Sequence, residues 1–123
     1  MNCVGVDIIE ISRIETAVQQ WGTRFLHRVF TESELEICRV NPSALAVRFA
    51  GKEAVMKVLG TGTTGISWKE IEILPEPSGK PFVNLYGKAK DKARSLGLDE
   101  VAISLSHSRE YAIAFAAGET IKA

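Results

Sequence analysis

Residues 47–62 constrain this chain most, because they read as a long helix that is apolar on both of its broad faces. At 100° per residue, one side carries Leu45, Phe49, Met56 and Leu59, and the opposite side carries Val47, Ala54 and Val58. A helix with neither broad face in water must lie inside a domain or in an interface. We therefore expect one long buried helix in the fold.

A carboxylate interrupts this apolar helix at Glu53. Lys57 lies four residues later and projects in the same direction, and the neighbours on that strip, Ala46 and Ala50, are small. The two charges could form an ordinary exposed ion pair, worth about 0.3–0.5 kcal/mol. Because polar positions are scarce on this helix, we instead interpret Glu53 as a group that needs a cation. The Gly-Thr-Gly sequence at 60–62 ends the helix and offers backbone N–H groups to an anion.

A second carboxylate lies near the start of the chain. Residues 3–11 form a β-branched run that predicts a buried strand, and Asp7 interrupts it. Asp7 could cap the following turn or pair with a nearby arginine. Two carboxylates on two core elements favour a shared role instead. Oxygen ligands from Asp and Glu, completed by water and phosphate, are how proteins usually hold Mg²⁺.

Composition excludes several classes of protein. The 123 residues are enough for one domain with a real core, and we assign 1–123 to a single domain. The formal net charge is zero, so no overall field favours nucleic acid or a membrane as partner. Cys3 and Cys38 are not spaced as a metal motif or a disulfide framework. With neither a leader pattern nor an apolar run of about 18 residues, we expect a cytoplasmic location.

Capping signals and periodicity predict the order of the elements. The expected elements are a strand at about 2–9, a helix from a capping box at 12–15 to about 22, a helix from a capping box at 31–34 to about 40, and the long helix from 41 to 59. They continue with a loop at 60–65, strands at 68–74 and 82–85, an amphipathic helix at 88–96, and a hairpin of strands at 101–107 and 111–117. This order predicts an α+β domain with a largely antiparallel sheet and helices packed on it.

Taken in order, these pieces resemble the holo-[acyl-carrier-protein] synthases, the short 4′-phosphopantetheinyl transferases of bacterial fatty-acid synthesis. The matching pieces are the strand with Asp7, Arg24-Phe25-Leu26, Val29-Phe30-Thr31-Glu32 with Glu34, Arg48-Phe49-Ala50-Gly51-Lys52-Glu53-Ala54, Gly60-Thr61-Gly62, Gly79-Lys80-Pro81, and Ser104-Leu105-Ser106-His107-Ser108 followed by Tyr111-Ala112-Ile113-Ala114. No piece is diagnostic alone, but together they cover nearly the whole chain. The resemblance implies a 4′-phosphopantetheinyl transferase-like fold.

The resemblance also implies an activity. The 4′-phosphopantetheine arm of coenzyme A would pass to a serine of apo-acyl-carrier protein, with release of adenosine 3′,5′-bisphosphate. Asp7 and Glu53 would hold the cofactor Mg²⁺, and Lys57 would balance charge on the transferred phosphate. The serine proton would go to Glu53 or to a water on the metal.

The remaining site residues also follow from the resemblance. Arg48, Gly60, Thr61, Gly62, His107 and Ser108 would contact coenzyme A, and Arg13, Arg24 and Arg28 would dock the acidic helix of the carrier protein. Each set has a plainer interpretation: a snorkelling arginine for Arg48, a polar residue at a sheet edge for His107, and a solvated face for the arginines.

The length of the chain bears on its oligomeric state. Transferases of this superfamily about twice as long build their site between two similar halves, so the resemblance implies a homotrimer with sites at subunit interfaces. Two alternatives stay open: a Mg²⁺-dependent nucleotide phosphohydrolase that uses the same carboxylates, and a non-catalytic coenzyme A-binding module.

Overall fold

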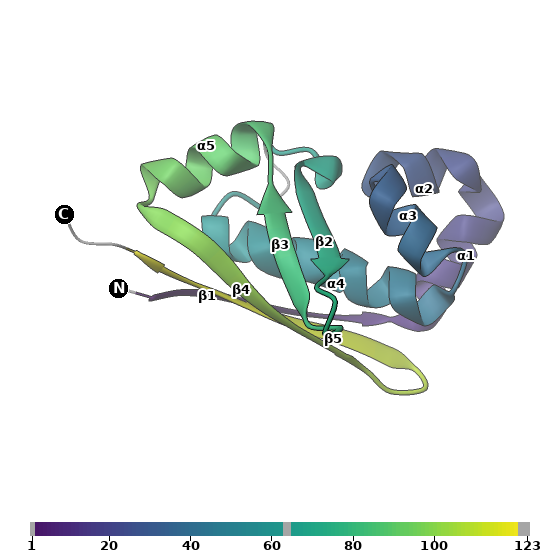
Figure 1. The fold of residues 1–123 in the computed structure, drawn as a ribbon. Coiled ribbons are helices and arrows are strands. Elements are labelled where there is room, and N and C mark those ends of the chain that lie inside the picture. Colours follow the sequence, from purple (N-terminus) through teal and green to yellow (C-terminus); the bar gives the residue numbers. More distant parts are fainter. Residues whose placement is uncertain (1, 63–64, 121–123) are drawn as a thin grey trace.

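The computed structural model describes residues 2–62 and 65–120, and in it the first and last strands of this range lie side by side (Figure 1). The elements in order are β1 (Asn2–Glu10), α1 (Ile11–Trp21), α2 (Thr23–Val29), α3 (Glu32–Cys38), α4 (Pro42–Leu59), the 3₁₀ turn η1 (Trp68–Glu70), β2 (Ile71–Pro75), β3 (Pro81–Leu85), α5 (Gly87–Ser95), β4 (Leu98–His107) and β5 (Tyr111–Thr120). The predicted α+β class with antiparallel strands is confirmed.

The first and last parts of the chain form one sheet. Its strand order is β1-β5-β4, with both pairs antiparallel, so the N-terminal strand lies at an edge beside the C-terminal one. Asp7 pairs in register with Ala114 of β5. Strands β2 and β3 form a separate antiparallel hairpin. Figure 1 shows this hairpin on one side of α4 and the long strands below it.

Helix α4 is the centre of the core, as expected. It packs on β1 and β5, on the β2 strand and on α1, and twelve of its eighteen residues are buried. Asn41 caps its N-terminus by accepting a hydrogen bond from the Ala44 amide, and Pro42 occupies the first turn. None of the helices in the described part of the chain is long and apolar enough to cross a membrane.

The helices before α4 correct one expectation. The prediction of a capping box at 12–15 is wrong. Helix α1 begins at Ile11, directly after β1, and the side chain of its N-cap residue, Glu10, makes no capping hydrogen bond. The reason is tertiary, because the Ile11 amide donates to the Glu110 carbonyl in the β4–β5 turn. The capping box at 31–34 is confirmed in α3. Helix α2, which follows Gly22, was not expected.

The segment before β2 corrects a second expectation. Residues 68–70 form η1 and not the first half of a strand, because Glu70 accepts hydrogen bonds from the amides of Ser67 and Lys88. Lys52 of α4, fully buried, donates to the carbonyls of Trp68 and Ile71 and forms an ion pair of 2.7 Å with buried Glu34 of α3. This lysine therefore fastens η1, β2 and α3 to the buried helix.

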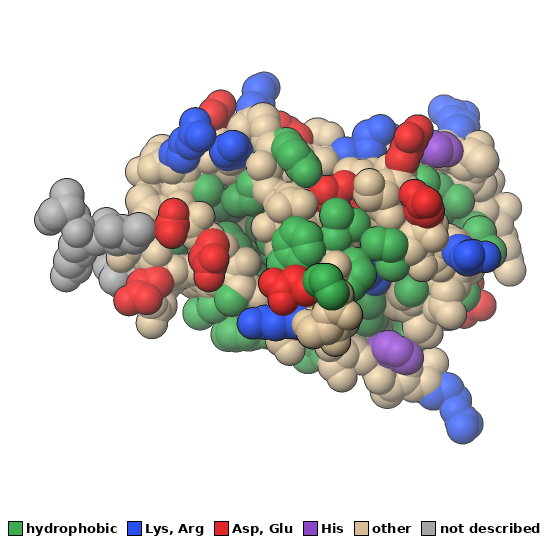
Figure 2. Space-filling model, in the orientation of Figure 1, with side chains coloured by type: hydrophobic (Ala, Val, Ile, Leu, Met, Phe, Trp, Pro, Cys, Tyr) green, Lys and Arg blue, Asp and Glu red, His purple; other side chains and the backbone are tan. Residues whose placement is uncertain are grey.

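One face of the sheet is left open to solvent. Its side chains, which we call the outer sheet face, are Val4, Val6 and Ile8 of β1 and Tyr111, Ile113 and Phe115 of β5, all between 41% and 60% exposed. Figure 2 shows acidic side chains gathered at the end of the molecule near the chain termini, where Asp99, Glu100 and Glu119 border an open hollow of about 1210 Å³. The outer sheet face is a large exposed apolar patch, and such patches are typical of interaction surfaces.

Candidate functional site

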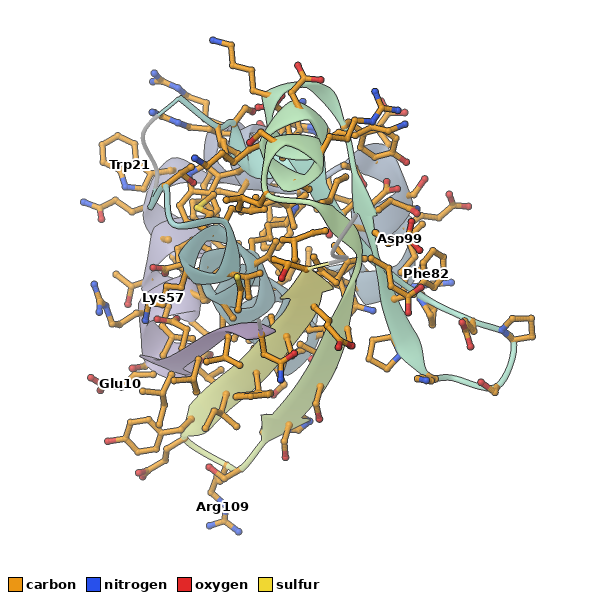
Figure 3. All side chains as sticks on the ribbon, turned by 90° about the vertical axis from the view of Figure 1, so that its left-hand side faces the viewer. Glu10, Trp21, Lys57, Phe82, Asp99 and Arg109 are labelled. Atoms are coloured by element: carbon orange, nitrogen blue, oxygen red, sulfur yellow. The ribbon has the colours of Figure 1, made fainter. Side chains whose placement is uncertain are left out.

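Strand β1 and helix α4 bring Asp7 and Lys57 together. The Lys57 ammonium donates to the Val6 carbonyl at 2.7 Å and to Asp7 Oδ1 at 3.3 Å. The Asp7 side chain is 15% exposed and the Lys57 side chain 53% exposed, so the pair lies at the rim of the core. Figure 3 shows Lys57 on the side of α4 that faces β1. Asp7 therefore pairs with a lysine, and within the part of the chain that the structure describes it neither caps a turn nor pairs with an arginine.

Glu53 completes this cluster. Burial raises the pKa of the Glu53 carboxyl, and the negative charge of Asp7 raises it further, while Lys57 and Arg13 act in the opposite direction. In the described part of the chain, no hydrogen bond or ion pair reaches the Glu53 carboxylate; Lys57 pairs with Asp7 instead. Glu53 is thus a carboxylate without a donor beside a second carboxylate, and a divalent cation would stabilise such a pair.

The described residues contain no group of three or more His, Cys, Asp or Glu side chains suited to a metal. A two-carboxylate site suits Mg²⁺, which keeps several waters and takes its other ligands from substrate phosphates. The same set would serve Zn²⁺ poorly, because zinc sites use three or four nitrogen and sulfur ligands.

A hollow of about 540 Å³ has one wall on α4, and its aromatic walls were not predicted from the sequence. Its lining residues are Trp21, Arg24, Phe25, Arg28, Val29, Phe49 and Trp68. Phe49 stacks on Trp68 with ring centroids 4.7 Å apart, and it lies one helical turn before Glu53. A signal was present in the sequence, since aromatic residues alternate with arginines over 21–28. The hollow therefore combines apolar walls with two exposed cations.

The loop after α4 has fewer free backbone N–H groups than the sequence predicted. The amides of Gly60 and Thr61 both close the helix, donating to the carbonyls of Lys57 and Met56. Gly60 adopts a left-handed conformation with φ 73°, as a helix-ending glycine often does. Only the Gly62 amide of these three has no partner among the described residues.

Three of the residues predicted to contact coenzyme A make no described hydrogen bond or ion pair with the carboxylate cluster. Arg48 is buried, and its guanidinium donates to the carbonyls of Ile73 and Ala44. His107 and Ser108 lie beside the turn of the β4–β5 hairpin, whose tip projects beyond the rest of the molecule with Arg109 at its end (Figure 3). No hydrogen bond or ion pair within residues 2–62 and 65–120 links any of the three to Asp7, Glu53 or Lys57.

The chain matches known proteins over almost its whole length. Residues 3–116 match the family model of the 4′-phosphopantetheinyl transferase superfamily. A holo-[acyl-carrier-protein] synthase of Dehalococcoides mccartyi strain CBDB1 is 54% identical over 114 residues, covering 93% of this chain and 95% of that protein. The synthase of Herpetosiphon aurantiacus is 46% identical, covering 96% and 98%.

Solved structures agree with the sequence matches. The crystal structure of Helicobacter pylori holo-[acyl-carrier-protein] synthase in complex with coenzyme A superposes with a TM-score of 0.87 at 32% identity, covering 94% of this chain and 99% of that one. The synthase of Neisseria meningitidis gives 0.85 at 34% identity, covering 96% and 98%.

Fold and sequence together define an enzyme of the phosphopantetheinyl transferase class. Within that class, this chain belongs to the holo-[acyl-carrier-protein] synthase family.

Proposed function

We propose that this enzyme transfers the 4′-phosphopantetheine group from coenzyme A to a serine of apo-acyl-carrier protein, with Mg²⁺ held by Asp7 and Glu53. The observation that carries the proposal is the meeting of two carboxylates and one lysine where β1 packs on α4. When bound, Mg²⁺ would supply positive charge against the pyrophosphate of coenzyme A, from which adenosine 3′,5′-bisphosphate leaves.

The side chains of this chain would bind and orient the reacting groups. Asp7 holds Lys57 in place, and the Val6 carbonyl fixes the ammonium from a second side. A cation held in this way can face a phosphate with little reorganisation, which is how preorganised charge lowers a barrier. The Glu53 carboxylate, which accepts no hydrogen bond among the described residues, has oxygen lone pairs that would be available to accept the proton of the attacking serine.

The aromatic hollow would receive the carrier protein. Arg24 and Arg28 on its rim suit an acidic partner, and Phe25, Phe49 and Trp68 suit the apolar side chains of an amphipathic helix. Arg13 is exposed on α1, and its charge acts on Glu53. A carrier helix lying across these residues would place its serine beside the carboxylates.

We also propose a homotrimer whose sites lie at subunit interfaces. Two observations support it. The outer sheet face leaves six large apolar side chains open to solvent. His107 and Ser108 are exposed at the tip of the β4–β5 hairpin, and among the described residues neither contacts the carboxylate cluster of its own chain, so these two side chains could reach the cluster of a second copy.

Intact mass spectrometry of the carrier protein tests the proposed activity. With coenzyme A and Mg²⁺, the carrier should gain the mass of one phosphopantetheine group. Asp7→Ala and Glu53→Ala should abolish the gain, and Glu36→Ala, which removes an exposed carboxylate of α3, should not. A phosphohydrolase would consume coenzyme A without changing the carrier, and a binding module would do neither. Either result would refute the proposal.

A further inference from the structure

Strand β1 approaches helix α4 so closely at Gly5 that no side chain fits between them. A Cβ atom built at Gly5 would lie 2.1 Å from the Ala54 carbonyl oxygen and 2.9 Å from Lys57 Cβ. Both distances fall below any ordinary contact between carbon and its neighbours. The first obstacle is helix backbone, which cannot rotate away as a side-chain terminus can, so a larger residue would displace the strand.

Gly5 and Asp7 are two residues apart on β1, so both face α4. The strand is an edge strand, held on one side by β5. If β1 retreats from Ala54, it carries with it the Val6 carbonyl and the Asp7 carboxylate, which now lie 2.7 Å and 3.3 Å from the Lys57 ammonium. Contact at Gly5 thus sets the separation between the carboxylate on the strand and the charges on the helix.

We propose that Gly5 is a positioning residue for the metal ligands, which sets the reach of Asp7 toward Glu53. This inference rests on the proposed function, because it concerns the same cation site. Mg²⁺ requires near-ideal octahedral geometry with ligand distances of about 2.0–2.1 Å, so a small displacement of one carboxylate should lower metal affinity steeply. Perturbing the groups that orient a ligand typically weakens binding by about 10–100-fold.

Gly118 of β5 provides a matched control. It is also a sheet glycine packed toward α4, but a Cβ there would meet only terminal side-chain atoms, Leu98 Cδ2 at 3.0 Å and Val58 Cγ1 at 3.5 Å. These methyl groups can shift without moving a strand. Gly118→Ala should therefore leave the carboxylates in place.

The test measures Mn²⁺ binding to the intact protein by electron paramagnetic resonance, without coenzyme A. Gly5→Ala should raise the Mn²⁺ dissociation constant at least about tenfold, and Gly118→Ala should change it less than about twofold. Adding Asp7→Glu to Gly5→Ala should restore part of the lost affinity, because one more methylene spans the wider gap. Alone, Asp7→Glu should weaken binding. Carrier-protein affinity in EDTA should be the same for all variants.

The outcomes separate the inference from the proposed function. If Asp7→Ala leaves Mn²⁺ affinity unchanged, the metal assignment itself is wrong. If Asp7→Ala abolishes binding while Gly5→Ala binds like the wild type, only the role of Gly5 is refuted. A Gly5→Ala protein that fails to fold beside a folded Gly118→Ala also counts against it, because the glycine would then serve the fold as a whole.

Discussion

Helix α4 carries two lysines, five residues apart, whose removal should have opposite consequences. Lys52 is fully buried, and its ammonium contacts Glu34, Trp68 and Ile71. Lys57 is 53% exposed and pairs with Asp7 at the rim of the core. We predict that Lys52→Met destabilises the protein strongly, whereas Lys57→Met leaves stability nearly unchanged and impairs transfer.

The magnitude follows from burial. Methionine has nearly the volume of lysine, so the cavity contribution is small, and the loss comes from the charge left behind. Glu34 would keep its hydrogen bonds from the Thr31 and Ile73 amides but lose the one cation that pairs with it among the described residues. Removing one partner of a buried pair costs about 3–5 kcal/mol, which for a domain of this size lowers Tm by roughly 10–20 °C. The exposed Lys57 pair contributes at most about 1 kcal/mol.

Thermal unfolding at one fixed protein concentration measures both variants, because assembly would make Tm depend on concentration. Transfer assays below the lower Tm measure the second half of the prediction. The reasoning is refuted if Lys52→Met unfolds within about 3 °C of the wild type, or if Lys57→Met is the less stable of the two. In the folded wild type, burial lowers the pKa of Lys52, although Glu34 opposes this.

Three further predictions concern the site and its surroundings. The pKa of Glu53 is raised in the folded state, so the metal-free protein should lose stability as pH rises from about 4, the pKa of an unfolded glutamate, through the higher folded value. Glu53→Gln should therefore be more stable than the wild type at pH 7 in EDTA. Denaturant titration should show this difference vanishing near pH 4. Phe115→Glu on the outer sheet face should give monomers in sedimentation and lower transfer activity, and an active trimer would contradict it. Arg13→Glu should raise the KM for carrier protein, more so than Arg24→Glu, while the KM for coenzyme A stays constant. Added salt should likewise raise the KM of the wild-type enzyme for carrier protein and leave its KM for coenzyme A unchanged.

The sequence determined most of the elements. An apolar pattern on both faces placed α4 in the core, Asn41 and Pro42 placed its start, and alternation placed β4 and β5, because these signals act over one or two turns of chain. The carboxylates of Asp7 and Glu53 were identifiable for the same reason: a charged residue is conspicuous in a run of apolar ones.

Long-range contacts decided the rest. The Ile11 amide reaches the Glu110 carbonyl and so begins α1 where no local cap exists. Lys52 looks like any helix lysine until α3, η1 and β2 enclose it. Gly5 looks like an ordinary strand residue until the Ala54 carbonyl is placed beside it. A sequence pattern reports which side chains avoid water, but the distance between two segments depends on how their surfaces pack, and that distance sets which charged side chains can pair.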